Sequence, residues 1–397
     1  MKRHLIGIGG VGMSALAVAF LRSGDEVTGA DRNCNSPNVR FLRSLGIEVF
    51  ADDGSGVDES VSEVIVSTAI ESNNPGLAKA TSLGIPVTHR AKALANLLSV
   101  RRLVAVAGTC GKSTVTAMLG HVLSECSLDP FCVNGANVPG WEGAVRAGGG
   151  QFAVAEIDES DKSIAEFSPY AAIVTNSSAD HYSKEEMDEV FDAFISRTSG
   201  PVVDARSEKI SGVDTSIPGE HNRINAAVAL RMAILLGCDE QKARKALLSF
   251  GGVERRFQKV GERVYDDYAH NPEKLTAMWK AFAELHPQGI CVIWRPHGYG
   301  PLVKMMDGLA GAFSSCMRNN DALILLPVYD AGGTADRTVN SDALASLVEG
   351  NVFLARDFDE AEKWCQERKD SFGAFITCGA RDPDIPAFAR RLAQSVM

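Results

Sequence analysis

The chain has 397 residues, of which 45% are hydrophobic and 23% are charged, and its formal net charge is −10. This length is enough for two or three domains with cores of their own. The negative charge argues against a general attraction to nucleic acid or to an anionic membrane. We therefore expect small molecules as partners, no nucleic acid and no membrane, and a monomer or weak dimer.

The cysteines indicate a compartment. Nine of them are scattered along the chain, without a C-x-x-C pair or a histidine at metal-ligand spacing. An odd number of dispersed cysteines fits a reducing environment. The N-terminal apolar run is too short for a signal peptide, and no apolar run reaches the roughly 18 residues of a membrane helix. We expect a cytoplasmic protein.

Short apolar strands alternate with amphipathic helices from residue 3 to about residue 98. Strands are predicted at 4–8, 26–30, 49–50, 63–67 and 85–87, and helices at 13–23 and 39–45. This rhythm predicts a parallel sheet with right-handed crossovers.

The first predicted strand runs into GIGGVGMSAL, residues 7–16, which contains a complete G-x-G-x-x-G. Asp31 follows about 20 residues later, as in a dinucleotide-binding fingerprint. Such a turn presents backbone N–H groups and a helix N-terminus to a pyrophosphate. Taken alone, the fingerprint favours NAD, so an NAD-dependent dehydrogenase is one interpretation.

A second alternation opens with an apolar strand at 103–107, followed by GTCGKST, residues 108–114, and a helix at 113–124. A strand, this glycine-rich turn and a helix are the context of a P-loop. There, backbone N–H groups cradle phosphate, Lys112 reaches the terminal phosphates and Ser113 offers an oxygen to Mg²⁺. The full Walker spacing would place a glycine at Val106. The alternative is a turn that only closes a strand–helix junction.

Polar residues follow the next two predicted strands, 152–156 and 171–175. AEIDESD, residues 155–161, supplies four carboxylates, and TNSSADH ends with His181. Ligands of open parallel sheets lie at the carboxyl ends of the strands, and Mg²⁺ prefers one or two carboxylates with hydroxyl and phosphate oxygens. A solvated acidic loop and a structural histidine are the alternatives.

A third alternation follows Phe250-Gly251-Gly252, after predicted helices at 222–236 and 240–250. Its strands are predicted at 263–265, 290–294, 322–326 and 374–377, and its helices at 272–285, 303–314 and 382–393. We therefore predict an α/β protein of three domains. They are a Rossmann-like N-terminal domain at 1–98, a central P-loop ATPase-like domain with a parallel sheet at 99–250, and a C-terminal Rossmann-like α/β domain at 251–397.

Three polar clusters of the third domain lie beside predicted strands. RRFQ, residues 255–258, precedes a strand, DDYAHNP, residues 266–272, follows it, and RPHGYGP, residues 295–301, follows the next strand. Each could be a surface turn, but their recurrence at strand ends favours a shared site.

These segments together resemble the Mur ligase family, which forms amide bonds with ATP in peptidoglycan synthesis. The likeness is strongest to members that join L-alanine to UDP-N-acetylmuramate. It runs through nearly the whole chain, in order and at compatible spacing. It is carried by GIGGVGMSALA, STAI with Asn74-Pro75, HRA at 89–91, GTCGKST, AEIDESD, IVTNSSADH, PGEHNRINAA, RRFQ and DDYAHNP.

The resemblance implies an ATP site with Lys112 at the β- and γ-phosphates and Asn222 at the adenine, beside His221. Residues from the third domain would complete this site when the domains close. The members it implies are Gly108, Thr109, Cys110, Gly111, Lys112, Ser113, Thr114, Asn176, His221, Asn222, Arg256, Asp267 and His270.

The resemblance also implies two Mg²⁺ ions, one on Ser113 and Glu156 and a second on His181. Lys112, Glu156, His181 and Arg256 would act in catalysis. The implied reaction phosphorylates a carboxylate to an acyl phosphate, which an amine then attacks to give an amide, ADP and phosphate. Because carboxylate and ATP repel each other, cations must neutralise the migrating phosphoryl group.

The two organic substrates have implied sites as well, with UDP-N-acetylmuramate on the glycine turn and the amino acid, L-alanine by preference, on the third domain. The residues implied for the UDP-sugar are Gly9, Gly10, Val11, Gly12, Met13, Ser14, Asp31, Ser67 and Arg90, and those implied for the amino acid are Tyr268, His270, His297 and Tyr299.

Three features depart from the family pattern. The P-loop has Cys110 and Ser113 where the alanine-adding members have GTHGKT, and the segment 181–218 is shorter than in the relatives. PHGYGP stands where those members have PHRYTR, so both arginines thought to hold the amino-acid carboxylate are missing. Arg295 or Lys304 is a candidate substitute.

Four alternatives therefore stay open. The chain could add a peptide or a different amine acceptor, or act on a substrate outside peptidoglycan synthesis. An NAD-dependent dehydrogenase would leave the P-loop unused. A non-catalytic homologue would not need Lys112, Glu156 and His181.

Overall fold

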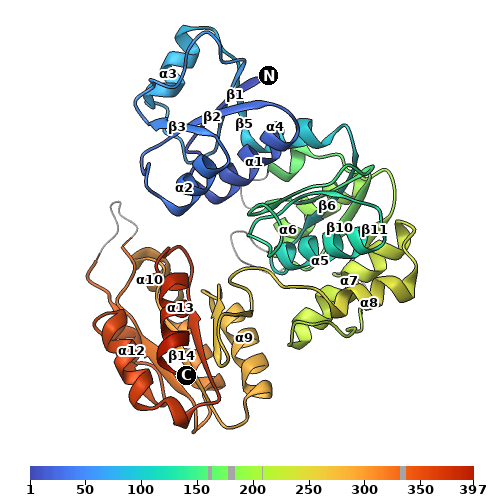
Figure 1. Cartoon of the computed structure of the whole chain (residues 1–397). Helices are drawn as coiled ribbons and strands as arrows, with labels where there is room; N and C mark the ends of the chain where they lie inside the picture. The colour runs from blue at the N-terminus through green and yellow to red at the C-terminus, as the bar shows by residue number, and fades with distance from the viewer. Residues whose placement is uncertain (160–162, 178–183, 208, 331–336) are drawn as a thin grey trace. The chain divides into compact units, whose positions relative to one another are not determined.

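The computed structural model describes residues 1–159, 163–177, 184–207, 209–330 and 337–397 (Figure 1). It confirms the α/β class, with three sheets dominated by parallel strands. The chain forms two compact units. One consists of Met1–Ser216 with Arg223–Gly251 and holds two sheets, and the other consists of Ile217–Asn222 with Gly252–Met397 and holds one. The division into three domains at residues 98 and 250 stays a prediction.

The first sheet is entirely parallel and has the order β3-β2-β1-β4-β5. Its strands are β1 (Lys2–Ile6), β2 (Glu26–Asp31), β3 (Glu48–Ala51), β4 (Glu63–Val66) and β5 (Val87–His89), and its helices are α1 (Val11–Arg22), α2 (Pro37–Ser44), α3 (Pro75–Ser82) and α4 (Arg90–Leu98). The strand order reverses between β1 and β4. Because loops diverge at such a point, it creates a ligand crevice, and the glycine turn follows β1 there.

The first sheet is buried on both faces, as a parallel sheet requires. Leu5 belongs to the core on one face, with Leu16 and Phe20 of α1. Its neighbour Ile6 belongs to the core on the other face, with Ala80 of α3. The period-2 alternation of strand side chains thus packs helices on both sides.

The second sheet has the order β11-β10-β6-β9-β7-β8, and only β8 is antiparallel to its neighbour among the described strands. Its strands are β6 (Arg102–Ala107), β7 (Phe131–Val133), β8 (Val145–Ala147), β9 (Phe152–Glu156), β10 (Ala171–Val174) and β11 (Val202–Asp204), and the helices of this region are α5 (Lys112–Glu125), α6 (Lys184–Ser196), α7 (Glu220–Leu235) and α8 (Glu240–Leu248). The central strand β6 lies between β9 and β10, so the P-loop after β6 has a strand end on each side.

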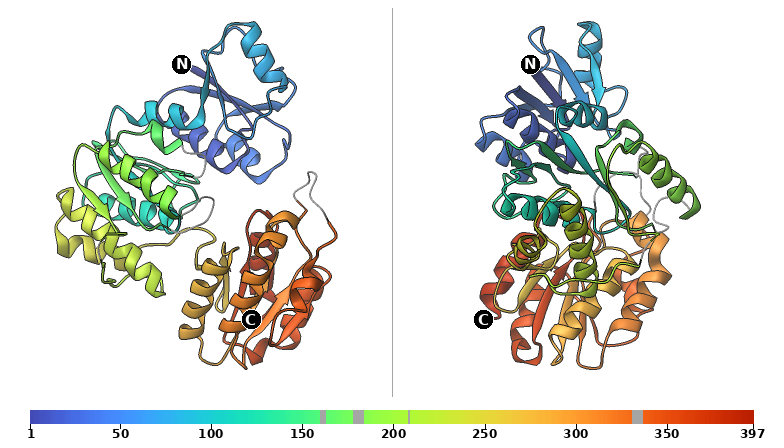
Figure 2. Two further views of the ribbon diagram at one scale, coloured as in Figure 1. Left: turned by 180° about the vertical axis from the view of Figure 1, so that it is seen from behind. Right: turned by 90° about the vertical axis from the view of Figure 1, so that its right-hand side faces the viewer.

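The third sheet has the order β12-β13-β17-β14-β15-β16, with only the short β12 antiparallel in the described chain. Its strands are β12 (Gln258–Lys259), β13 (Val264–Asp267), β14 (Ile290–Trp294), β15 (Ala322–Leu325), β16 (Val352–Leu354) and β17 (Ala374–Cys378), and its helices are α9 (Pro272–Leu285), α10 (Tyr299–Cys316), α11 (Ser341–Ala345), α12 (Phe358–Glu367) and α13 (Ile385–Ser395). The last strand in sequence is therefore inserted between β13 and β14. Figure 2 shows helices on both faces of this sheet.

Alternating side chains anchor the helices of the third sheet too. Ile293 belongs to a core with Phe375 and Phe388. The next residue, Trp294, points to the opposite face and meets Phe313 of α10 edge-on, at 5.4 Å between ring centroids. Trp279 of α9 meets the same phenyl ring. Helices α9 and α10 therefore share one side of the sheet.

Most predicted elements are confirmed, and the strand 152–156, the strand 290–294 and the helix 272–285 have their predicted bounds. The predicted strand 4–8 ends at Ile6, because Gly7 already has a φ of +73°. The structure adds short edge strands and amphipathic helices that the sequence interpretation missed. No helix in the described ranges is long and apolar enough to cross a membrane.

Candidate active site

The glycines of the P-loop are required by the structure. Gly108 and Gly111 have φ angles of +131° and +83°, a region that favours glycine. A Cβ atom on Gly108 would lie 2.1 Å from the Thr175 Oγ1 atom, and one on Gly111 would lie 2.6 Å from the Asn225 Oδ1 atom. Side chains from a neighbouring strand end and from α7 therefore press directly on the turn.

Asn176, predicted to contact ATP, is engaged with the P-loop itself. Its Oδ1 atom accepts hydrogen bonds from the Thr109 hydroxyl at 2.7 Å and from the Cys110 N–H at 2.9 Å. Its Nδ2 atom donates to the Cys110 carbonyl at 3.0 Å, and the Thr175 hydroxyl donates to the same carbonyl at 2.6 Å. The end of β10 thus holds the turn in place.

Lys112 is half-buried at the start of α5 and already has partners. Its ammonium donates to the Gly108 carbonyl at 2.6 Å and forms an ion pair with Glu159 at 2.9 Å. Burial opposes the charge on Lys112, but Glu159 and Glu156 outweigh burial and raise the pKa of the ammonium. Burial raises the pKa of Glu159, against the attraction of Lys112. A charged lysine in the phosphate turn fits phosphate binding.

Ser113 and Glu156 lie together as predicted for a Mg²⁺ site. The Ser113 hydroxyl donates to a Glu156 carboxylate oxygen at 2.6 Å, and the Gly135 N–H donates to the same oxygen at 2.8 Å. A hydroxyl beside a carboxylate is a hard-oxygen pair of the kind that Mg²⁺ binds, so these residues fit the ion. His181, predicted for a second ion, lies outside the described residues, and the described ones form no cluster of three metal-ligating side chains.

The glycine turn after β1 is shaped by Asp31. The Gly9 N–H donates to Asp31 at 2.8 Å, and a Cβ atom on Gly9 would lie 2.8 Å from the same carboxylate oxygen. Asp31, predicted to contact a ligand, therefore fastens the turn and occupies the Gly9 donor. The remaining candidate donors are the N–H groups of Val11, Gly12 and Met13 in the first turn of α1.

The other residues predicted for the UDP-sugar have contrasting surroundings. Gly10 donates its N–H to the Gly7 carbonyl, and the buried Ser14 hydroxyl donates to the Val11 carbonyl. Ser67 is half-buried directly after β4, the strand beside β1. Ser67 is thus at the predicted crevice, whereas Ser14 stabilises the helix.

Arg90 connects the glycine turn to the second sheet. Its guanidinium would contact a Cβ atom on Gly12 at 3.3 Å, and it donates to the Asp158 carboxylate after β9 at 3.0 Å. Glu156, in the predicted metal site, is the last residue of that same strand. Within the first unit, Arg90 therefore lies between the predicted UDP-sugar and metal sites.

Asp267 at the end of β13 is held by backbone donors of its own unit. One carboxylate oxygen accepts from the Phe257 N–H and the other from the Ala269 N–H, both at 2.8 Å. Burial raises the pKa of Asp267, while these bonds and the charges of Arg256 and His221 act in the opposite direction. Three residues predicted for the ATP site, Arg256, Asp267 and His221, are therefore electrostatically linked.

Asn222, predicted at the adenine, has a structural partner. It is only 5% exposed, and its Nδ2 atom donates to the Pro218 carbonyl at 2.7 Å. The segment Ile217–Asn222 belongs to the second compact unit although α7 continues into the first. The Asn222 side chain thus binds a carbonyl of the segment before α7 instead of capping a helix N–H group.

The sequence interpretation missed a buried network beside Asp267. Arg255, with a φ of +57°, donates to Asp266 at 3.0 Å, and the Thr377 hydroxyl donates to the other Asp266 oxygen at 2.9 Å. Burial raises the pKa of Asp266 to about 6. Arg255 and Asp266 are the first members of the Arg-Arg and Asp-Asp pairs in RRFQ and DDYAHNP. The resemblance implied roles only for the second members of these pairs.

Three of the four residues predicted for the amino acid form an aromatic cluster. Tyr268 and His270 lie 5.4 Å apart between ring centroids, and His270 and His297 lie 5.0 Å apart. Burial, with the charges of Arg381 and Lys274, lowers the pKa of His297 to about 4. With this low pKa, the His297 imidazole is neutral near pH 7. The fourth residue, Tyr299, begins α10 and has the Arg337 guanidinium 5.9 Å from its ring.

Arg295 does not substitute for the missing arginines. Its guanidinium pairs with Asp382 at 2.6 Å and donates to the Pro327 carbonyl. The side chain of Asp382 is only 1% exposed, so this pair is structural. Lys304, the other suggested substitute, is exposed on α10.

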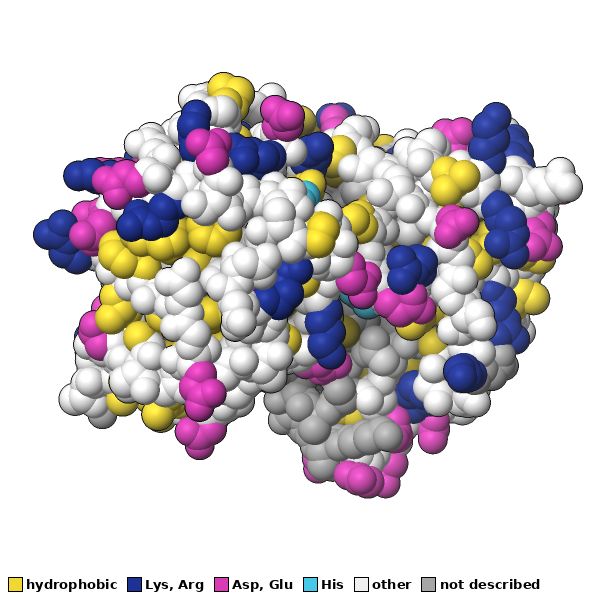
Figure 3. All heavy atoms as spheres, turned by 90° about the horizontal axis from the view of Figure 1, so that it is seen from below, with side chains coloured by type: hydrophobic (Ala, Val, Ile, Leu, Met, Phe, Trp, Pro, Cys, Tyr) yellow, Lys and Arg dark blue, Asp and Glu magenta, His cyan; other side chains and the backbone are white. Residues whose placement is uncertain are grey.

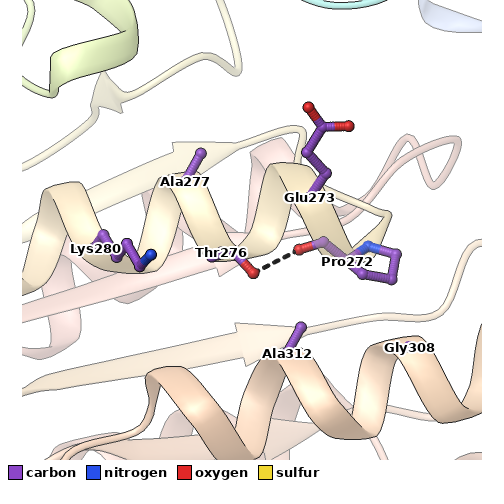
Figure 4. Close-up of a pocket in the computed structure, with 7 residues that line it drawn as sticks. All are labelled: Pro272, Glu273, Thr276, Ala277, Lys280, Gly308 and Ala312. Carbon is purple, nitrogen blue, oxygen red and sulfur yellow. Dashed lines mark hydrogen bonds between the residues drawn. The ribbon is translucent and has the colours of Figure 1, made fainter. Parts of the chain in front are cut away.

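A groove of about 610 Å³ lies between α9 and α10 of the second unit. Figure 4 shows Thr276 donating to the Pro272 carbonyl and Glu273 directed away from α10. The small residues Gly308 and Ala312 line the groove on the facing helix. The lining is mostly apolar and contains none of the predicted site residues. Charges of both signs are interspersed over the face drawn in Figure 3.

Comparison with known proteins places this arrangement in a family. Residues 2–102 match the family described as "Mur ligase family, catalytic domain", and residues 255–381 match "Mur ligase, glutamate ligase domain". The P-loop lies between the two matches, so its assignment rests on its geometry and on full-length relatives.

Full-length relatives cover most of this chain. UDP-N-acetylmuramate–L-alanine ligase from Brucella anthropi is 32% identical over 87% of this chain and 86% of its own length. The enzyme of the same name from Hyphomonas neptunium is 31% identical over 88% and 87%. The crystal structure of UDP-N-acetylmuramate-alanine ligase from Thermotoga maritima has a TM-score of 0.82 at 27% identity, covering 99% of this chain and 98% of that one.

A more distant structure shares the fold. A murein peptide ligase from Psychrobacter arcticus has a TM-score of 0.66 at 19% identity and covers 100% of this chain and 98% of its own. The family membership disfavours the dehydrogenase interpretation of the glycine turn, because it accounts for the P-loop and the third sheet as well. From the full-length relatives, the shared fold and the two family matches, we conclude that this chain belongs to the Mur ligase family.

Proposed function

We propose that this chain joins the carboxylate of UDP-N-acetylmuramate to an amino acid, with L-alanine as the preferred acceptor. Membership of the Mur ligase family makes it an ATP-dependent ligase of peptidoglycan synthesis. The choice of UDP-N-acetylmuramate and L-alanine rests on one agreement. The full-length relatives reported above bear a single name, and this chain keeps an intact phosphate turn around Lys112.

The proposed reaction has two steps. A carboxylate oxygen of the UDP-sugar attacks the γ-phosphorus of ATP, and ADP leaves. The amine nitrogen then attacks the acyl carbon, phosphate leaves with the bonding electrons, and the nitrogen loses a proton. The products are an amide, ADP and phosphate.

The residues of the first unit supply positive charge and orientation. Lys112 holds a charged ammonium at the phosphate turn, and α5, whose N-terminal N–H groups are potential phosphate donors, begins at the same residue. Ser113 and Glu156 would hold Mg²⁺, which when bound supplies charge neutralisation for phosphate oxygens. Because phosphates compete with Glu159 for Lys112, ATP binding would exchange one anionic partner of the lysine for another.

Several assignments remain part of the proposal. They are the UDP-sugar on the first turn of α1 with Ser67 and Arg90, the nucleotide contacts of Arg256, Asp267 and His270, and the second Mg²⁺ on His181. The contacts of Arg90 with the glycine turn and with Asp158 support the first of these.

Phosphate release from Mg-ATP tests the proposal. The assay combines the protein with UDP-N-acetylmuramate and a panel of amino acids and short peptides. Release that requires both the UDP-sugar and L-alanine is the expected result. If no UDP-sugar stimulates release, the proposed substrate is wrong.

A second candidate is a ligase that adds a peptide or a different amine acceptor. It is favoured by Gly298 and Pro301, which stand at the positions of the missing arginines. Release that requires the UDP-sugar with a peptide, and not with L-alanine, would select this candidate.

A further inference from the structure

The loops that follow β13, β17 and β14 leave the third sheet side by side at its carboxyl edge. Asp267 of β13 and Trp294 of β14 are both in register with Cys378 of the central strand β17. His270, His297 and Arg381 each follow one of these aligned residues by three positions. The loop after β17 therefore emerges between the two loops that carry the predicted amino-acid site.

Arg381 has an unusual backbone for its residue type. Its φ is +63°, in the left-handed region, where a residue with a Cβ atom is strained. The turn is fastened on both sides, because the Gly379 carbonyl accepts from Arg255 at 2.6 Å and Asp382 pairs with Arg295. The fold thus holds an arginine where glycine would be less strained, as happens at functional sites.

No ion pair within the described residues neutralises the charge of Arg381. Its side chain is exposed, and no hydrogen bond or ion pair joins its guanidinium to another residue in the described ranges. Arg295, by contrast, is neutralised by a buried partner. A guanidinium without a carboxylate partner matches an anion that binds from outside.

Lys274 adds a second charge to the same place. It lies half-buried in the first turn of α9, just after the helix cap at Asn271. Arg381 and Lys274 both act on the pKa of His297, so both lie within electrostatic reach of that imidazole. Two cations therefore flank the aromatic cluster.

We propose that Arg381, with Lys274 beside it, binds the carboxylate of the incoming amino acid or peptide. The sheet register, the exposed guanidinium and its strained backbone carry this assignment. It replaces the two arginines absent at Gly298 and Pro301 by a cation from the neighbouring loop. The assignment rests on the proposed function.

The test compares Arg381→Gly with Arg381→Lys. Glycine removes the charge and relieves the backbone, so the variant should fold. We expect the KM for L-alanine to rise roughly 10- to 100-fold, as for a lost charge-assisted pair, while the KM for ATP is unchanged. Lysine should restore part of the affinity. The control Arg356→Gly removes an exposed arginine of the same unit and should leave both constants unchanged.

L-Alaninamide isolates the carboxylate. The wild-type enzyme should prefer L-alanine to this amide, and Arg381→Gly should lose that preference. If the panel identifies another acceptor, that acceptor and its amide replace the pair. Equal KM values for Arg381→Gly and an active wild type would overturn the assignment and leave the proposed function standing.

Direct binding separates the two proposals. If no UDP-sugar supports turnover, the proposed function fails, and calorimetric titration with L-alanine tests Arg381 by itself. Binding to the wild type that Arg381→Gly loses would support the assignment. Equal binding by both proteins, or no binding by either, would overturn it.

Discussion

The phosphate turn of the second sheet and the carboxyl edge of the third sheet are built in different ways. The turn is one continuous segment, and its shape follows from two glycines and from clamping by Asn176. The edge of the third sheet is assembled from three loops that together span more than a hundred residues of sequence, and these loops carry His270, His297 and Arg381. A local motif can therefore be recognised in a sequence, whereas an assembled edge requires the strand order.

The two regions also differ in how they keep their cations. Lys112 has a buried carboxylate partner, Glu159, which its ligand has to displace. Arg381 is exposed and forms no ion pair within the described residues. The cation of the phosphate turn is thus paired with a carboxylate of the protein, whereas the cation of the third sheet is accessible to an anion from solution.

The largest effect is expected from Lys112→Ala. Without the ammonium at the phosphates, turnover should fall by roughly 10³-fold, about 4 kcal/mol of transition-state stabilisation. Phosphate release measures the loss, and binding of UDP-N-acetylmuramate should be retained.

Lys112→Ala leaves Glu159 buried without its partner, so a stability control is needed. The double variant Lys112→Ala/Glu159→Gln removes both charges and should recover the folded state without recovering activity. Loss of UDP-sugar binding in a folded double variant would contradict the separation of the two sites in the first unit.

Glu159→Gln tests the internal anion itself. It removes the carboxylate that pairs directly with the Lys112 ammonium and leaves only the more distant charge of Glu156. The free energy of unfolding without nucleotide should therefore fall by about 3 kcal/mol. ATP phosphates can replace the lost carboxylate. Thermal unfolding should therefore show a larger stabilisation by ATP in this variant than in the wild type, and equal stabilisation would contradict the exchange of partners.

Gly108→Ala tests how tightly β10 presses on the turn. The new methyl group would meet Thr175, whereas at Gly24, which also has a positive φ of +91°, nothing lies within 4 Å. Gly24→Ala should cost about 1 kcal/mol of backbone strain. Gly108→Ala should cost about 2 kcal/mol more through overpacking, as measured by denaturant unfolding. Equal losses would show that the turn has room to move.

The smallest effect concerns the pKa of His297. Arg381→Gly removes one of the charges that, after burial, lower this pKa to about 4, so the pKa should rise. NMR titration of the imidazole signals measures the change. His4 is a matched control, because burial and Lys2 lower its pKa to about 4 in a different sheet. A rise at both histidines would point to loosening of the fold rather than to a lost charge.

The lowered pKa values of His4 and His297 also determine how the free energy of unfolding changes with pH. Both are neutral when folded and have an ordinary pKa of 6.5 when unfolded. The unfolded chain therefore binds protons first as the pH falls, so their contribution is complete above about pH 6.5 and decreases toward pH 4. Arg381→Gly should reduce the part of this loss that comes from His297.

The sequence by itself determined the α/β class, most of the long helices and buried strands, and the P-loop. These features depend on short-range patterns, namely period-2 and period-3.6 burial and glycines at positive φ. It also identified the segments by which the chain belongs to the Mur ligase family. Short strands such as β7 and β11 were missed, because three residues carry too little pattern.

Only the tertiary structure decided which side chains of those segments are engaged and which are open. Glu159 as the partner of Lys112, Asn176 as the clamp of the P-loop and Arg295 as a structural residue follow from contacts between distant parts of the chain. Arg381 became a candidate because the last strand is inserted between β13 and β14. Strand order is set by long-range packing, which no local pattern records.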